Sequence, residues 1–262
     1  MGHTRIGRIP KSKSWESILN LLNADEIASP KLSVDEIAAI ANESILATEK
    51  GLIDAANDTG VCEAIFIVAK TLEAIALKDS RNEFYINIEN ISGIREFAYE
   101  LNSKIRAYFL ENSISTDKAE IALKAISKSI AEIKFDSQLS LLGDINNNQN
   151  INKLASKVGF ASFGQLFIAN FTNLYSNFFL SRLTNFSVGS ERLQNINELT
   201  HFNVSASQHW NESSYIVRSL SGDWFAKRVY FEKNINRSSV RAFLSLAFRK
   251  MSAEAKTQRG AR

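Results

Sequence analysis

The chain has 262 residues, of which 45% are apolar, and it carries a formal net charge of +3. This length and apolar content suffice for one large domain, or two small ones, with a buried core. Cys62 is the only cysteine, which excludes an intrachain disulfide framework and a cysteine-only zinc site and favours a reducing, cytoplasmic setting. No signal peptide or membrane-spanning segment is expected, because the N-terminus lacks an apolar core and acids and lysines interrupt the most apolar window.

Prolines occur only at positions 10 and 30, so the strongest helix breaker is absent from the rest of the chain. We therefore predict an all-α protein, a single bundle of about seven or eight helices with a long aromatic-striped central helix. A basic arm is expected over residues 1–13, the helical domain over 14–255 and a basic tail over 256–262.

The apolar periodicity of the first half of the sequence predicts a series of amphipathic helices. A short helix capped by Ser14 is followed by a helix over 34–56, which starts with a capping box of Ser33 and Glu36. The next helix, over 61–78, is expected to form an antiparallel hairpin with it.

Residues 82–90 alternate apolar and polar side chains and are compatible with a strand or a link. We favour the link, since no partner strand is evident. Helices over 93–110 and 117–133 follow, the second capped by Thr116. The polar segment 143–150 is a candidate boundary between two halves. We favour one domain, because separated halves would leave the next helix uncovered.

That helix runs from Val158 to Val188, and its aromatic residues recur at three- or four-residue steps. They are Phe160, Phe163, Phe167, Phe171, Tyr175 and Phe178. Such a stripe indicates the centre of a helical core. A groove for a cofactor or lipid is the less common alternative, since apolar stripes are ordinarily buried.

The last third predicts a second long helix from Leu193 to Leu220, with Ser221-Gly222 as its C-cap. Residues 224–230 are expected to form a loop or short extended piece. Ser238 or Ser239 then caps the final helix.

Charge is concentrated at both ends of the chain. Residues 1–13 carry a net +4 and residues 218–262 a net +8. The residues between therefore carry −9, given the total of +3. Such asymmetry can steer a chain onto phosphate or onto an acidic partner.

These cations, with neighbouring aromatics, form the candidate site for a partner or a nucleic acid, because rings stack on bases while cations neutralise phosphates. The candidate residues are Arg5, Arg8, Lys11, Trp224, Phe225, Lys227, Arg228, Arg241 and Arg249. The alternative is that the aromatics pack the last helix onto the bundle and leave a solvated basic rim.

No metal, cofactor or catalytic site is predicted. His201 and His209 are eight residues apart, too far to share an ion on one helix, and no zinc-hydrolase motif accompanies them. Cys62 lies in an apolar helix, where a thiol acts as a small hydrophobe. A third hypothesis is an enzyme that uses His209 with a nearby carboxylate. It holds only if the fold brings distant residues together in a cleft.

Four short motifs resemble landmarks of an uncharacterised bacterial family of all-helical proteins. They are Thr4-Arg5-Ile6-Gly7-Arg8-Ile9-Pro10, Phe163-Gly164-Gln165-Leu166-Phe167, Leu180-Ser181-Arg182-Leu183 and Gly222-Asp223-Trp224-Phe225-Ala226-Lys227. The resemblance covers most of the chain and implies no activity. It implies accessory subunits of multi-gene loci, with antiviral defence as one setting. Asp223 replaces a second glycine expected before Trp224, which puts the geometry of that loop in question.

The leading hypothesis is a cytoplasmic, non-enzymatic helical adaptor or subunit of a larger bacterial assembly, which holds a protein partner through its basic ends. The alternative is a nucleic-acid-binding protein that uses the basic aromatic C-terminal segment on DNA or RNA. No cofactor and no membrane partner is expected.

Overall fold

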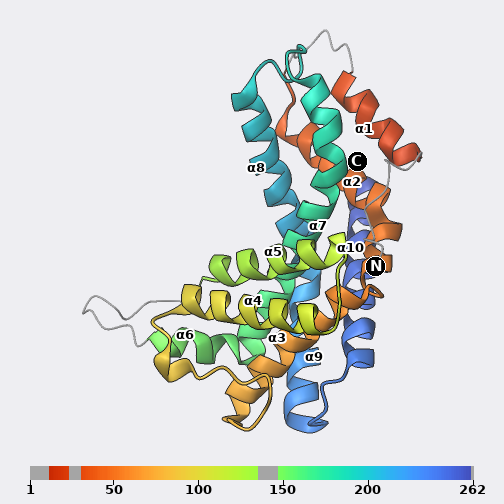
Figure 1. Cartoon of the computed structure of the whole chain (residues 1–262). Helices are drawn as coiled ribbons and strands as arrows, with labels where there is room; N and C mark the ends of the chain where they lie inside the picture. Colours follow the sequence, from red (N-terminus) through yellow and green to blue (C-terminus); the bar gives the residue numbers. More distant parts are fainter. Residues whose placement is uncertain (1–11, 24–30, 135–146, 261–262) are drawn as a thin grey trace.

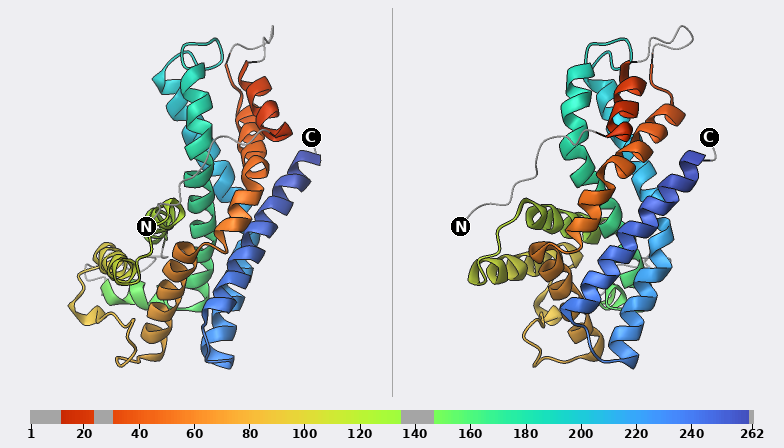
Figure 2. Two further views of the ribbon diagram at one scale, coloured as in Figure 1. Left: turned by 45° about the vertical axis from the view of Figure 1, so that its right-hand side comes forward. Right: turned by 90° about the vertical axis from the view of Figure 1, so that its right-hand side faces the viewer.

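The computed structural model describes residues 12–23, 31–134 and 147–260, and these residues form the all-α bundle that the sequence predicts. Most of the helices run along one long axis (Figures 1 and 2). They are α1 (Lys13–Asn23), α2 (Val34–Ala55), α7 (Lys157–Ser187), α8 (Ile196–Ser213), α9 (Val217–Ala226) and α10 (Arg237–Gly260).

The remaining helices build out the lower part and one side of this bundle (Figure 1). They are α3 (Thr59–Leu77), α4 (Ile94–Glu111), α5 (Asp117–Glu132) and the short α6 (Asn147–Leu154). Helices α4 and α5 lie side by side and cross the long axis, so that they project to one side, with α5 packed against α7. Between α3 and α4 the chain forms a link with one 3-10 turn, Ile88–Asn90, as favoured from the sequence.

Helix α7 is the centre of the fold, and five of the six aromatic side chains of the predicted stripe are buried, whereas Phe178 is half-buried and Phe179 takes its place. Each of the rings Phe160, Phe163, Phe167, Phe171, Tyr175 and Phe179 lies 5.6–6.2 Å from the next, centroid to centroid. All six are at most 6% exposed. Rings of α9 and α10 pack against this ladder, with Phe225 stacked on Phe160 at 4.3 Å and Phe248 at 5.4 Å from Phe171. These rings fill the space that the alternative cofactor or lipid groove would need.

The opposite face of α7 carries amide side chains, which are also buried. Gln165 donates to Asn211 of α8 at 3.1 Å, and Asn173 donates to Ser207 of α8 at 2.9 Å. Asn170 donates to two oxygens of α5. Because buried polar groups are costly unless they are hydrogen-bonded, these amides fix how α5 and α8 sit against α7.

The capping residues of several helices are those expected. Ser33 and Glu36 form the capping box of α2, and Thr116 accepts from the backbone N–H of Ala119 at the start of α5. Two caps differ from the expectation. The hydroxyl of Ser12, not Ser14, lies at the start of α1, and Asn236 with Ser239 forms the reciprocal cap of α10.

The predicted antiparallel hairpin of α2 and α3 is wrong. Helix α3 continues beyond α2 toward the other end of the molecule (Figure 2). The link is short, and Ala56 keeps helical dihedrals of φ −63° and ψ −20°, so the chain bends there without reversing.

The second long helix is interrupted, and it does not end at Ser221-Gly222. A 3-10 turn at Ser214–Ile216 separates α8 from α9. Ser221 and Gly222 lie inside α9 and are buried against α7. Residues 224–226 are helical and 227–231 form a π-helical turn, where a loop or extended piece was expected. Small residues thus serve helix packing here, and the predicted C-cap is absent.

Two further expectations concern the polar segments. Residues 143–146 of the candidate boundary lie outside the described residues, whereas 147–150 belong to α6. Residues 256–260 of the expected tail belong to α10, which therefore presents Lys256 and Arg259 at fixed positions.

The close approach of α7 and α9 yields a test. A Cβ at Gly164 would lie 2.3 Å from Oγ and 2.5 Å from Cβ of Ser221. We expect Gly164→Ala to lower the free energy of unfolding, because overpacking costs about 1–3 kcal/mol and exceeds the gain of at most about 1 kcal/mol in helix propensity. Urea unfolding measures the change. The control Gly260→Ala meets no atom within 4 Å and should be neutral or slightly stabilising. Adding Ser221→Gly should restore stability to the Gly164→Ala variant, and an unchanged deficit would contradict the packing argument.

Candidate interaction surface

The predicted basic aromatic segment lies at the turn between α9 and α10, at the lower end of the molecule (Figure 1). Residues Lys227–Phe231 form one π-helical turn, in which the N–H of Glu232 donates to the carbonyl of Lys227 at 3.0 Å. Lys233 follows with φ of +48°, a conformation that is unfavourable for a residue with a Cβ. Such π-turns and strained residues are frequent at functional sites.

The structure divides the aromatic residues of this segment into two groups. Phe225 is fully buried, and Trp224 is half-buried and stacked on Phe243 at 4.8 Å. Phe225 is therefore not available as a base-stacking or partner-binding ring, and that site prediction is corrected, whereas Trp224 keeps only part of its ring exposed. The reason is that the segment is helical, which places Phe225 and Val229 on the face toward the bundle. This packing is the alternative that the sequence left open.

Tyr230 and Phe231, by contrast, face outward and are 45% and 83% exposed. They were not among the predicted site residues. The sequence does contain a signal for their exposure, which is the helical period of α9 continued through residue 231. Positions 225 and 229 share one face in this period, and position 231 lies on another.

The predicted cations have different surroundings. Lys227 and Arg228 both pair with Glu232, Lys227 at 3.4 Å. Arg241 and Arg249 are exposed residues of α10, and the guanidinium of Arg241 reaches the buried thiol of Cys62 on α3. Arg5, Arg8 and Lys11 lie outside the described residues.

Much of the positive charge of the C-terminal region is paired with acidic side chains of the same chain. Arg237 pairs with Glu63 of α3 at 2.6 Å. Near the other end of α10, Lys256 pairs with Glu49 and Arg259 approaches Glu43, both on α2, at 2.8 and 3.5 Å. These C-terminal cations therefore hold α10 against acids of α2 and α3. Only the remaining positive charge of the C-terminal region is available to a partner.

The ion pair of Arg237 is open to a direct stability test. Glu63 is buried, with 8% of its side chain exposed, so removing its partner leaves a carboxylate with too few hydrogen bonds. We expect Arg237→Ala to lower the free energy of unfolding by about 1–3 kcal/mol, measured by urea unfolding. Arg249→Ala, an exposed arginine on the same helix, should change it by less than about 0.5 kcal/mol. Equal effects of the two changes would contradict the role of the pair.

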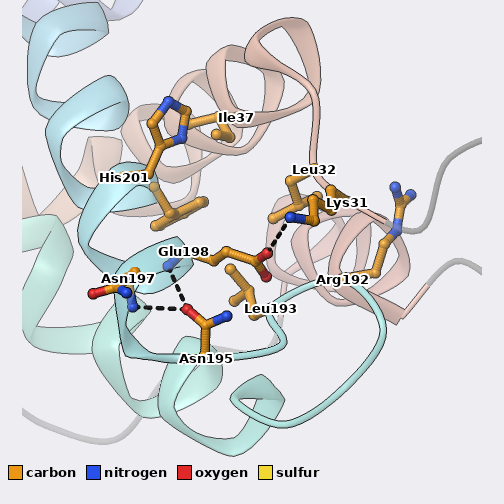
Figure 3. Close-up of a pocket in the computed structure, with 10 residues that line it drawn as sticks. Lys31, Leu32, Ile37, Arg192, Leu193, Asn195, Asn197, Glu198 and His201 are labelled. Atoms are coloured by element: carbon orange, nitrogen blue, oxygen red, sulfur yellow. Dashed lines mark hydrogen bonds and ion pairs between the residues drawn. The ribbon is translucent and has the colours of Figure 1, made fainter.

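A second feature is a pocket of about 380 Å³ at the opposite end of the bundle, between the starts of α2 and α8 (Figure 3). It is lined by Lys31, Leu32, Ile37, Arg192, Leu193, Asn195, Asn197, Glu198, His201 and Phe202. The amide oxygen of Asn195 accepts from the backbone N–H groups of Asn197 and Glu198 at 2.9 and 3.2 Å and so caps α8.

Two reciprocal ion pairs join the helix starts at this pocket. Glu36, in the first turn of α2, pairs with Arg192 of the segment before α8 at 2.9 Å. Glu198, in the first turn of α8, pairs with Lys31 of the segment before α2 at 2.9 Å. Arg192 is only 4% exposed, and its Nε and Nη1 are enclosed. We call these two ion pairs the clasp. Because the charged side chains are paired with each other, the clasp joins the starts of α2 and α8.

Hydrogen bonds at the helix starts, together with the ion pairs of the clasp, lower the pKa of both glutamates. Burial alone raises the pKa of Glu36, but hydrogen bonds from the N–H and hydroxyl of Ser33 and from Arg192 outweigh it. The Lys31 ammonium, with the backbone N–H of Gln194, lowers the pKa of Glu198. Both carboxylates are therefore ionised at neutral pH.

A pH titration of stability tests the clasp. Because the pKa of each glutamate is lower in the folded state than its ordinary value of 4.5, the stabilisation is complete above that value. It is lost as the pH falls through the folded pKa. We expect the Tm of the wild type to fall between about pH 5 and 3, and the double variant Glu36→Gln, Glu198→Gln to fall less steeply from a lower starting value. Glu111→Gln, at the exposed end of α4, is the control. Parallel pH profiles of all three proteins would contradict the clasp.

His209 lies on α8 and is half-buried. Its Nε2 lies 3.3 Å from the amide oxygen of Asn42, whose Nδ2 donates to the carbonyl of Ala255. This histidine thus connects α8, α2 and α10, whereas His201 lines the pocket of Figure 3.

No family model, no curated protein and no solved structure matches this chain. The family resemblance of the four motifs therefore stays a prediction. Among the described residues, no three His, Cys, Asp or Glu side chains are grouped so as to hold a metal ion. Nor is any helix of those residues long and apolar enough to cross a membrane.

Proposed function

We propose that the chain is a non-enzymatic helical adaptor, or a subunit of a larger assembly, that holds a protein partner through the turn between α9 and α10. The observation that carries this proposal is Phe231, which is 83% exposed. Its neighbours are the exposed Tyr230, Lys227 and Lys233. Aromatic residues are enriched at the centres of protein interfaces, and polar or charged residues such as these lysines belong to the rim.

The residues beneath this turn support the proposal. Phe225, Trp224 and Phe243 form a cluster of rings around Phe160 of α7, so the turn follows directly on a helix that is anchored in the aromatic core. A contact surface whose backbone is already fixed loses less conformational entropy on binding. The bacterial defence setting implied by the sequence motifs belongs to the same proposal.

Affinity purification from the native host at native expression tests it. We expect the wild type to recover a partner in near-stoichiometric amount, and Phe231→Asp to lose it by at least about 10-fold, as for an interface hot spot of about 2 kcal/mol or more. Leu110→Asp is the matched control, since Leu110 is also 83% exposed and lies on a different helix. Both changes should leave the Tm unchanged, because both side chains are exposed.

Two outcomes would overturn the proposal. Either the wild type copurifies with no protein, or Phe231→Asp recovers the same partner in the same amount. Loss of the partner from both variants would point to a general effect of added negative charge.

A second candidate function is nucleic-acid binding by the C-terminal segment. The exposure of Lys227, Arg241 and Arg249 favours it, and Tyr230 with Phe231 would replace Trp224 and Phe225 as stacking rings. The single-strand binding measurement described below, applied to Arg249→Glu and Phe231→Asp, separates this candidate from the first.

A further inference from the structure

A shallow groove of about 590 Å³ lies between α4 and α5. These two helices project to one side of the long axis (Figure 1). Arg95, Tyr99, Asn102 and Arg106 line it from α4, and Ser127 and Ala131 from α5. Among the described residues no carboxylate lines this groove. The other side of α4 differs, because Glu96 and Glu100 line the groove there. One helix thus separates a cationic groove from one that contains acids.

The two arginines of the groove differ in how open they are to an anion. Arg95 is exposed and forms no ion pair within the described ranges. Arg106 makes two hydrogen bonds of 3.1 Å to the carboxylate of Glu120. That pair is about half exposed, so a phosphate can reach this guanidinium, but it must displace a bidentate carboxylate, the geometry in which an exposed pair is strongest.

Between the arginines the groove offers a ring and an amide. Tyr99 is 69% exposed, which leaves its ring free to stack. The Nδ2 of Asn102 donates to Ser127 at 2.6 Å and approaches the carbonyl of Leu123 at 3.4 Å. This fixes the amide, and its oxygen accepts no hydrogen bond from any residue that the structure describes. The amide oxygen is therefore a positioned acceptor for the edge of a base.

Spacing along α4 decides what kind of anion fits. Arg95 and Arg106 are eleven residues apart, which corresponds to about 16 Å along a helix, and Tyr99 lies between them. One phosphate cannot reach both guanidinium groups, whereas successive phosphates of one strand can. A duplex hides the faces of its bases, so only an unpaired base can stack on the tyrosine.

We propose that the groove between α4 and α5 binds single-stranded nucleic acid, with phosphates at Arg95 and Arg106 and a base on Tyr99. This inference is independent of the function proposed for the turn between α9 and α10. Cations and an aromatic ring along one groove are the combination that such strands require.

Fluorescence anisotropy with labelled DNA and RNA single strands of about 15 nucleotides, at several salt concentrations, tests the proposal. We expect Tyr99→Ala to weaken binding by about 5- to 100-fold, as for one lost stack, without changing the slope of affinity against salt. Tyr99→Phe keeps the ring and should bind like the wild type. Arg95→Glu should weaken binding and flatten that slope by about 0.7, the value for one phosphate contact on a single strand.

Controls separate this site from general electrostatics. Arg81→Glu makes the same charge change at a side chain that is 96% exposed and lies outside the groove, and it should bind within about 2-fold of the wild type, as expected without a phosphate contact. Phe231→Asp should also retain binding, so failure here is distinguishable from failure of the proposed function. Adenosine monophosphate should compete poorly because it spans one arginine only.

Several outcomes would overturn the proposal. One is an equal loss in Arg81→Glu and Arg95→Glu, and another is wild-type affinity in Tyr99→Ala. A larger loss in Arg249→Glu would place the strand on α10. Stronger binding of a duplex or of a poly-glutamate peptide would assign the groove to a different partner.

Discussion

The fold depends on one constraint, which is that α7 is enclosed on nearly all sides and must satisfy two unlike faces. Its aromatic ladder packs against α9 and α10, and its amides donate to α5 and α8. The apolar face supplies most of the burial, since each ring removes on the order of 150–250 Å² from water. The amides fix the position of α8 on α7, because a shifted α8 would leave Gln165 and Asn173 buried without acceptors. Stability and geometry thus come from opposite sides of the same helix.

The close contact of α7 with α9 determines which residues the lower turn exposes. Gly164 and Gly222 let the two backbones approach, which aligns Phe225 with Phe160. The π-helical turn follows directly and alters the helical register after Ala226. Val229 faces inward, while Tyr230 and Phe231 reach solvent. The turn that exposes these two rings thus continues directly from a helix that is packed tightly on α7.

Local sequence patterns predicted the parts of this fold that depend on local energetics. The bounds of α7, the capping box at Ser33 and the cap at Thr116 are examples, because periodicity and hydrogen-bonding side chains act within a few residues. The direction of α3 after α2 was not predictable in this way. It depends on three residues at the bend and on which distant helices cover α3. For the same reason Ser221-Gly222 resembled a C-cap, although tertiary packing against α7 decides its role.

Charge shows most clearly why the candidate site was only partly predictable. Summed along the sequence, the C-terminal region is strongly basic, yet Arg237, Lys256 and Arg259 meet acids that are between 174 and 216 residues away. Residues 94–134 carry nearly equal numbers of acidic and basic side chains. Their summed charge therefore does not indicate a binding site. Folding places the acids of α4 on one side and its arginines on the other. Available charge is therefore a property of a surface, and a helix of almost neutral composition can present an exposed cation such as Arg95.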